Sequence, residues 1–158
     1  MKIFDYKKYH LIGIGGIGIS AIARKLQLDG KVVSGSDASQ SEITDDLQNL
    51  GIKIFIGQKA QNIPDGTEVV IYTVAIPEEN PVLEEARKRG IICKTYPEAL
   101  GELSESMFTI AVSGTHGKTT TTAMIAHILK KAGLDPTVIV GSKMLSDGEK
   151  AGSNFLAG

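Results

Sequence analysis

Cysteine, tryptophan and an excess of charge of either sign are scarce or absent in this sequence of 158 residues. The single cysteine, Cys93, excludes a disulfide within the chain and any metal site built from several cysteines, and it fits a reducing compartment. With 17 Lys and Arg against 18 Asp and Glu, the net charge of −1 excludes a broad basic surface for nucleic acid. No segment is long and apolar enough to span a bilayer. We therefore expect a cytoplasmic protein that binds neither nucleic acid nor membrane.

The residues that are present predict an α/β fold. Hydrophobic residues make up 42% of the chain and charged residues 22%, which is ordinary for a globular protein with a real core. Short strand-like segments alternate with helical patterns, as in parallel α/β architecture. We predict strands at 9–13, 31–36, 53–57, 68–73 and 91–95. Helices are predicted from the glycine-rich loop after the first strand to about residue 29, at 41–50 and at 81–89.

A change of pattern near residues 96–105, a short polar helix or connector, marks a domain boundary. We predict one domain at 1–105 and the beginning of another at 106–158, with a strand at 107–112, a helix at 119–132 and a strand at 137–140. Residues 142–158 show no clear period. The helix carries an apolar stripe made of Met124, Ile125, Ile128 and Leu129.

The second domain is too short to close on itself. Its later acids, Asp135, Asp147 and Glu149, follow no apolar strand that could aim a carboxylate at a metal. We therefore expect the chain to be the N-terminal part of a longer enzyme.

A first glycine loop, residues 13–18, matches G-x-G-x-x-G between a predicted strand and a predicted helix. Glycines allow the backbone to approach a diphosphate, and the helix N-terminus offers unpaired N–H groups. The motif also fits a tight turn that binds no ligand. Asp37, at the end of the next strand, is typical of a ribose ligand in a nicotinamide enzyme, or of a simple turn or N-cap residue.

A second glycine loop, residues 114–119, is more specific. Gly-Lys-Thr at a strand-to-helix turn predicts a phosphate loop, in which Lys118 contacts the β- and γ-phosphates and Thr119 binds Mg²⁺. Val112 stands where the usual motif has its first glycine, so the loop is a variant. His116 either contacts a phosphate or is a tolerated loop residue. Elsewhere, His10 and Cys93 fit packed positions and His127 fits a solvated one.

The two loops together resemble those of the Mur ligases, and most of all the member that adds L-alanine to UDP-N-acetylmuramate. The resemblance extends over nearly the whole chain, and it is carried by residues 13–20, 34–37 and 114–124, with Ala75-Ile76 and Asn80-Pro81 between them. It implies a Rossmann-like first domain that holds UDP-N-acetylmuramate instead of NAD. The diphosphate would lie on Gly15, Gly16, Ile17 and Gly18, and the uridine and sugar near Asp37, Thr73 and Ala75.

For the second domain, the resemblance implies an ATP site of the P-loop kind. Its members would be Gly114, Thr115, His116, Gly117, Lys118, Thr119 and Thr120. Lys118 would stabilise the transferring phosphoryl group as the catalytic residue, and Thr119 would hold Mg²⁺. ATP would activate the muramoyl carboxylate as an acyl phosphate, which the amine of L-alanine then attacks in peptidoglycan synthesis. Because the acceptor region is absent, we expect this chain to bind the UDP-sugar but not to ligate.

The sequence departs from the Mur ligase pattern at two places, and three alternative functions remain. Gln58 follows Gly57 where the family commonly has histidine, and Thr73-Val74-Ala75 stands where it often has a serine pair. A related ligase that recycles murein tripeptide onto UDP-N-acetylmuramate would share the ATP loop. A NAD-binding Rossmann domain would explain the first loop but not Lys118 and Thr119. A noncatalytic nucleotide-binding module is the third alternative.

Overall fold

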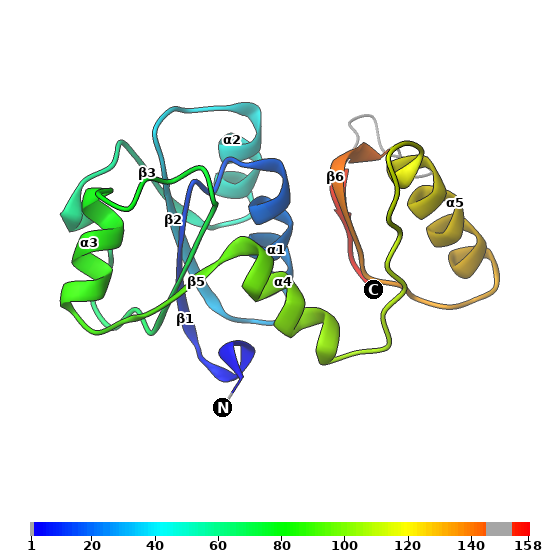
Figure 1. The fold of residues 1–158 in the computed structure, drawn as a ribbon, viewed down its shortest axis with the longest axis horizontal. Helices are drawn as coiled ribbons and strands as arrows, with labels where there is room; N and C mark the ends of the chain where they lie inside the picture. The colour runs from blue at the N-terminus through cyan, green and yellow to red at the C-terminus, as the bar shows by residue number, and fades with distance from the viewer. Residues whose placement is uncertain (1, 145–152) are drawn as a thin grey trace. The chain divides into compact units, whose positions relative to one another are not determined.

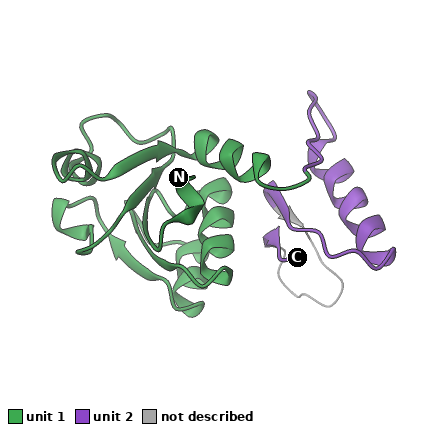
Figure 2. Ribbon diagram, turned by 90° about the horizontal axis from the view of Figure 1, so that it is seen from below, with its two compact units in different colours: residues 1–108 green, residues 109–158 purple. Residues whose placement is uncertain are grey.

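A five-stranded sheet with its helices forms the first of two units, residues 1–108, and a helix with two antiparallel strands belongs to the second, residues 109–158 (Figure 2). The computed structural model describes residues 2–144 and 153–158. Asp147 and Glu149, two of the acids that follow the second glycine loop, lie outside the described residues.

All neighbouring strands of the first unit run parallel, in the order β3-β2-β1-β4-β5 (Figure 1). Their bounds are β1 Lys8–Ile12, β2 Val32–Asp37, β3 Lys53–Ile56, β4 Val69–Tyr72 and β5 Ile92–Thr95. The predicted parallel α/β architecture is therefore confirmed for this unit. Because β2 and β4 lie on opposite sides of β1, the chain changes direction across the sheet at the end of β1, where ligands of such sheets bind.

Helices cover both faces of this sheet (Figure 1). They are α1 Ile17–Leu28, α2 Glu42–Asn49, α3 Pro81–Lys88 and α4 Tyr96–Glu105, with short 3₁₀ turns η1 Ile3–Asp5 and η2 Ala60–Asn62. Side chains alternate along β1, so that Tyr9 and Leu11 pack in the cluster that includes residues of α1, α2 and α4. Ile12 packs with residues of α3 on the opposite face. This burial on both faces explains the apolar strands of the sequence.

The segment 96–105, for which the sequence left a helix or a connector open, is the helix α4. Its start is capped in both directions: Thr95 Oγ1 accepts from Glu98 N, and the Glu98 carboxylate accepts from Thr95 N at 2.7 Å. Pro97 stands in the first turn, where its missing N–H costs nothing. This cap places Tyr96 at the first helical position, directly after β5.

The second unit contains α5 Lys118–Lys131, β6 Val138–Met144 and β7 Ser153–Leu156, and β6 and β7 pair antiparallel. The predicted strand at 107–112 is wrong, since these residues form neither helix nor strand. A strand needs a neighbour, and the two sheets of the described chain are built from other segments. The strand predicted at 137–140 is longer than expected, and β7 lies in a region where no period was seen.

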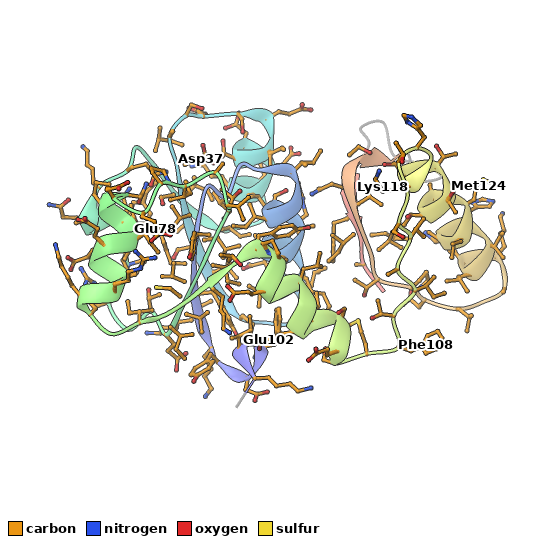
Figure 3. All side chains as sticks on the ribbon, viewed as in Figure 1. Asp37, Glu78, Glu102, Phe108, Lys118 and Met124 are labelled. Carbon is orange, nitrogen blue, oxygen red and sulfur yellow. The ribbon has the colours of Figure 1, made fainter. Side chains whose placement is uncertain are left out.

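The apolar stripe predicted on α5 is only partly buried. Ala126 packs against Val138 and Val140, whereas the side chains of Met124 and Ile128 are 61% and 62% exposed. Figure 3 shows Met124 on the side of α5 away from β6. Strand β6 therefore packs on the side of α5 that carries Ala126. Among the described residues, every helix is too short or too polar to cross a membrane.

Candidate functional site

The first glycine loop joins β1 to α1 at the carboxyl edge of the parallel sheet. Gly13 has φ of +76°, a conformation that favours glycine, and its N–H donates to Ser36 O at 2.8 Å. The N–H of Gly16 donates back to Gly13 O at 2.9 Å, which closes a tight turn before α1 begins at Ile17. The loop therefore brings the open N-terminus of α1 to the edge where strands end.

Asp37, at the end of β2, reaches this loop. Its Oδ2 accepts a hydrogen bond from the N–H of Gly15 at 2.8 Å, and its Oδ1 accepts one from Ser39 N at 3.4 Å. A Cβ atom on Gly15 would stand 2.9 Å from the same Oδ2, so only glycine fits there without movement. The Asp37 carboxylate therefore stabilises both the glycine loop and the turn that follows β2.

The segment after β4 contributes Thr73, which lies against the loop. A Cβ atom on Gly13 would stand 2.5 Å from Thr73 Cγ2, so the threonine methyl occupies the space that the glycine leaves. The N–H of Ile76 donates to Thr73 O at 3.0 Å, which turns the chain back. Ala75, also predicted at the site, is exposed in this turn.

A buried pair of hydrogen bonds that sequence reasoning missed joins His10 to two serines of β2. His10, fully buried on β1, has its Nδ1 3.0 Å from Ser34 Oγ and its Nε2 3.3 Å from Ser36 Oγ. Because Ser34 Oγ donates to Tyr9 O, the Nδ1 of His10 carries the proton that bonds Ser34. Ser36 Oγ also lies 3.5 Å from Gln58 Oε1. Burial lowers the pKa of His10 to about 4, so the ring is neutral.

Tyr96 is a second residue that sequence reasoning missed. It follows β5 and its ring stands on Gly18 in the first turn of α1: a Cβ atom on Gly18 would lie 2.7 Å from Tyr96 Cζ and 2.8 Å from Tyr96 Oη. The available signal was its position directly after a predicted strand, since the carboxyl ends of parallel strands share one edge.

The second glycine loop precedes α5 in the second unit. Gly117 is the N-cap, with φ of +77°, and Gly114 has φ of +146°. The ammonium group of Lys118 bonds the loop's own carbonyls, at 2.5 Å to Gly114 O and 3.2 Å to Thr115 O. His116 and Thr120 are exposed. The loop therefore presents a helix N-terminus together with a lysine that is held over it, an arrangement suited to an anion.

Hydroxyl oxygens gather at the start of α5. Ser142 Oγ, from β6, donates to Thr119 Oγ1 at 3.2 Å. Within the described ranges, no group of three His, Cys, Asp or Glu side chains could hold a metal ion. Mg²⁺, however, takes one or two protein oxygens and completes its shell with water and phosphate oxygens, so the hydroxyl of Thr119 fits that ion.

Two family descriptions match the chain. "Mur ligase family, catalytic domain" matches residues 8–107, and "Mur ligase middle domain" matches residues 112–156. The UDP-N-acetylmuramate–L-alanine ligase of Paracoccus denitrificans is 51% identical over 142 residues, which are 90% of this chain and 30% of that protein.

Solved structures agree. The UDP-N-acetylmuramate-alanine ligase of Thermotoga maritima superposes with a TM-score of 0.87 at 38% identity, over 97% of this chain and 35% of that one. The UDP-N-acetylmuramate:L-alanyl-gamma-D-glutamyl-meso-diaminopimelate ligase of Neisseria meningitides gives a TM-score of 0.82 at 29% identity, over 93% of this chain and 46% of that one. The chain spans about a third of the length of the curated relatives it matches.

Proposed function

This chain belongs to the Mur ligase family, and we propose that it supplies the UDP-N-acetylmuramate-binding domain and the beginning of the ATP-binding domain of a ligase that joins L-alanine to that sugar nucleotide. One observation carries the proposal: the 51% identity over 142 residues with a relative whose name states both substrates. Two glycine loops at helix N-termini, one in each unit, support it, because the reaction needs two nucleotide ligands.

In the first unit, residues 1–105 in the predicted division, the diphosphate binds the loop Gly15–Gly18 at the start of α1. The strand-end residues Asp37, Thr73 and Ala75 lie around the uridine and sugar. The parallel sheet supports this role because its strands deliver the loop, Asp37 and Thr73 to one edge. The hydrogen bond from Gly15 N–H to Asp37 preorganises the loop for the ligand. Preorganisation lowers the conformational entropy that is lost on binding.

In the second unit, Gly114, Thr115, His116, Gly117 and Thr120 surround the phosphates of ATP. Lys118 contacts the transferring phosphoryl group as a compact positive charge, and Thr119 gives an oxygen to Mg²⁺. ATP would transfer its γ-phosphoryl group to the muramoyl carboxylate and leave as ADP. The amine of L-alanine would then attack the acyl phosphate and release inorganic phosphate. The residues of this chain contribute positioning and charge neutralisation, since no side chain in the described part of the chain is arranged as a covalent catalyst.

The chain by itself binds but does not ligate. These 158 residues span about a third of the length of the ligases that they match. An amide-forming assay with ATP, UDP-N-acetylmuramate and L-alanine therefore gives no turnover above background. Turnover would show that the chain contains the acceptor site.

Two alternative functions compete with this proposal. A tripeptide-recycling ligase would differ in the acceptor, and a NAD-binding domain would differ in the ligand of the first unit. The tripeptide-recycling ligase uses the same sugar nucleotide, and it is disfavoured by the lower identity of its structure, 29% against 38%. A NAD-binding domain is disfavoured by family membership and leaves the Lys118 loop unexplained.

Thermal unfolding with separate additions of UDP-N-acetylmuramate, UDP, NAD and Mg-ATP tests the proposal. A ligand at about a hundred times its Kd adds about 2.7 kcal/mol to the free energy of unfolding, a rise in Tm of roughly 5–10 °C for a chain of this size. We expect a rise with both uridine nucleotides and with Mg-ATP, and none with NAD. A rise with NAD and none with UDP would overturn the proposed function.

A further inference from the structure

Tyr96 places a phenol hydroxyl at the proposed diphosphate site. Its ring overlies Gly18, where a Cβ atom would be 2.8 Å from Tyr96 Oη. Gly18 is the second residue of α1, so the hydroxyl lies close to the first turn of that helix. The capped start of α4 fixes the backbone of Tyr96 through the Thr95 and Glu98 bonds.

The hydroxyl is available to a ligand. In residues 2–144 and 153–158, Tyr96 Oη makes no hydrogen bond, although the side chain is half-buried. By contrast, the hydroxyl of buried Tyr9 donates to Ile3 O at 2.7 Å. Burial raises the pKa of Tyr96 above its usual value, so the phenol keeps its proton at neutral pH and remains a donor.

The loop itself leaves few donors for a diphosphate. The N–H groups of Gly13 and Ile14 bond Ser36 O, that of Gly15 bonds Asp37, and that of Gly16 bonds Gly13 O. Residues 13–18 contain no lysine or arginine. Side chains of neighbouring elements can therefore add donors for a doubly charged group, and Tyr96 is one that contacts Gly18 in the first turn of α1.

We propose that Tyr96 Oη donates a hydrogen bond to a phosphate oxygen of the nucleotide diphosphate held at the start of α1. The inference rests on the proposed function and adds a ligand-binding residue from β5–α4 to a site otherwise built from the β1, β2 and β4 ends. It assigns Tyr96 to the phosphates and not to the uracil or the sugar.

The test is calorimetric titration of the whole chain and of Tyr96→Phe with UDP-N-acetylmuramate, UDP and uridine. A hydrogen bond to a charged group predicts about a tenfold rise in Kd for both diphosphates and no change for uridine, which has no phosphate. The Tm of the unliganded variant should match the parent within about 1 °C, because the hydroxyl has no hydrogen-bond partner among the described residues to lose.

Tyr6→Phe is the matched control. Tyr6 is also half-buried, but it precedes β1 and so lies at the opposite end of the strand from the loop. It should leave all Kd values unchanged. An unchanged Kd for UDP in Tyr96→Phe, an equal loss for uridine, or a loss limited to UDP-N-acetylmuramate would overturn the assignment. Failure of the parent chain to bind UDP would instead refute the proposed function.

Discussion

The carboxylate of Asp37 accepts a hydrogen bond from the backbone N–H of Gly15 at 2.8 Å, across 22 positions of sequence. This bond ties the end of β2 to the glycine loop that follows β1. An acid at the end of the second strand is usually interpreted as a ribose ligand. Here one carboxylate oxygen of Asp37 accepts a hydrogen bond from the protein backbone. Asp37 therefore stabilises the loop and is also a candidate contact of the sugar nucleotide.

Replacing Asp37 with Ala should weaken both stability and binding. The loss of a partly buried, charge-assisted hydrogen bond should lower the free energy of unfolding by about 1–2 kcal/mol. The loop also loses its fixed shape, so the Kd for UDP should rise. Urea denaturation and calorimetric titration measure the two effects. Asp65→Ala is the control, because that side chain is fully exposed in a long pair with Arg89 and should change stability by less than about 0.5 kcal/mol. Equal effects of the two substitutions would contradict the role given to Asp37.

Adding a methyl group to Gly18 should damage the site. A Cβ atom there would be 2.7 Å from Tyr96 Cζ, so Gly18→Ala must push the ring away and should cost about 1–3 kcal/mol of stability. The Kd for UDP should rise with it. Gly101→Ala on α4 is the control: nothing lies within 4 Å of its added Cβ, and alanine should stabilise that helix by about 0.5–1 kcal/mol. A Gly18→Ala chain as stable as the Gly101→Ala chain would show that Tyr96 does not pack as described.

Acid should destabilise the first unit through His10. Burial lowers the pKa of His10 to about 4 in the folded chain, against the usual 6.5 when unfolded. The unfolded chain therefore binds the additional proton first, so stability is complete above pH 6.5 and falls as the pH drops from 6.5 to 4. The full loss is about 3 kcal/mol on this pKa difference. Urea titrations between pH 4.5 and 7.5 measure it.

The parent chain is the reference for that pH dependence. His10→Gln should flatten the slope while lowering stability at neutral pH, because the glutamine cannot reproduce both serine bonds. An unchanged slope in His10→Gln would assign the acid sensitivity to other groups.

The lysine of the second loop should control binding of Mg-ATP. Lys118 bonds the carbonyls of Gly114 and Thr115, so its ammonium already lies over the loop where phosphates are proposed. Lys118→Ala should raise the Kd for Mg-ATP at least about tenfold and leave the Kd for UDP unchanged, because hydrogen bonds to charged groups are strong. Lys130→Ala, exposed at the other end of α5, should change neither. Retained Mg-ATP binding in Lys118→Ala would refute the proposed role of the second loop.

The sequence by itself determined the features that depend on near neighbours in the chain. The parallel α/β order and the glycine loop of the first unit followed from local patterns, because glycine conformations, helix caps and strand alternation act over a few residues. The roles of individual residues at the sites stay predictions that the ligand experiments above will decide.

The tertiary structure alone decided the features that need a distant partner. Residues 107–112 have the composition of a strand, yet a strand exists only where a neighbour completes its ladder. β7 becomes visible only through its pairing with β6. Tyr96 contacts Gly18 and Asp37 contacts Gly15 because the fold brings separate strand ends to one edge. His10 contacts Ser36 because β1 and β2 lie side by side. No local period records such contacts, since they depend on which strands lie side by side.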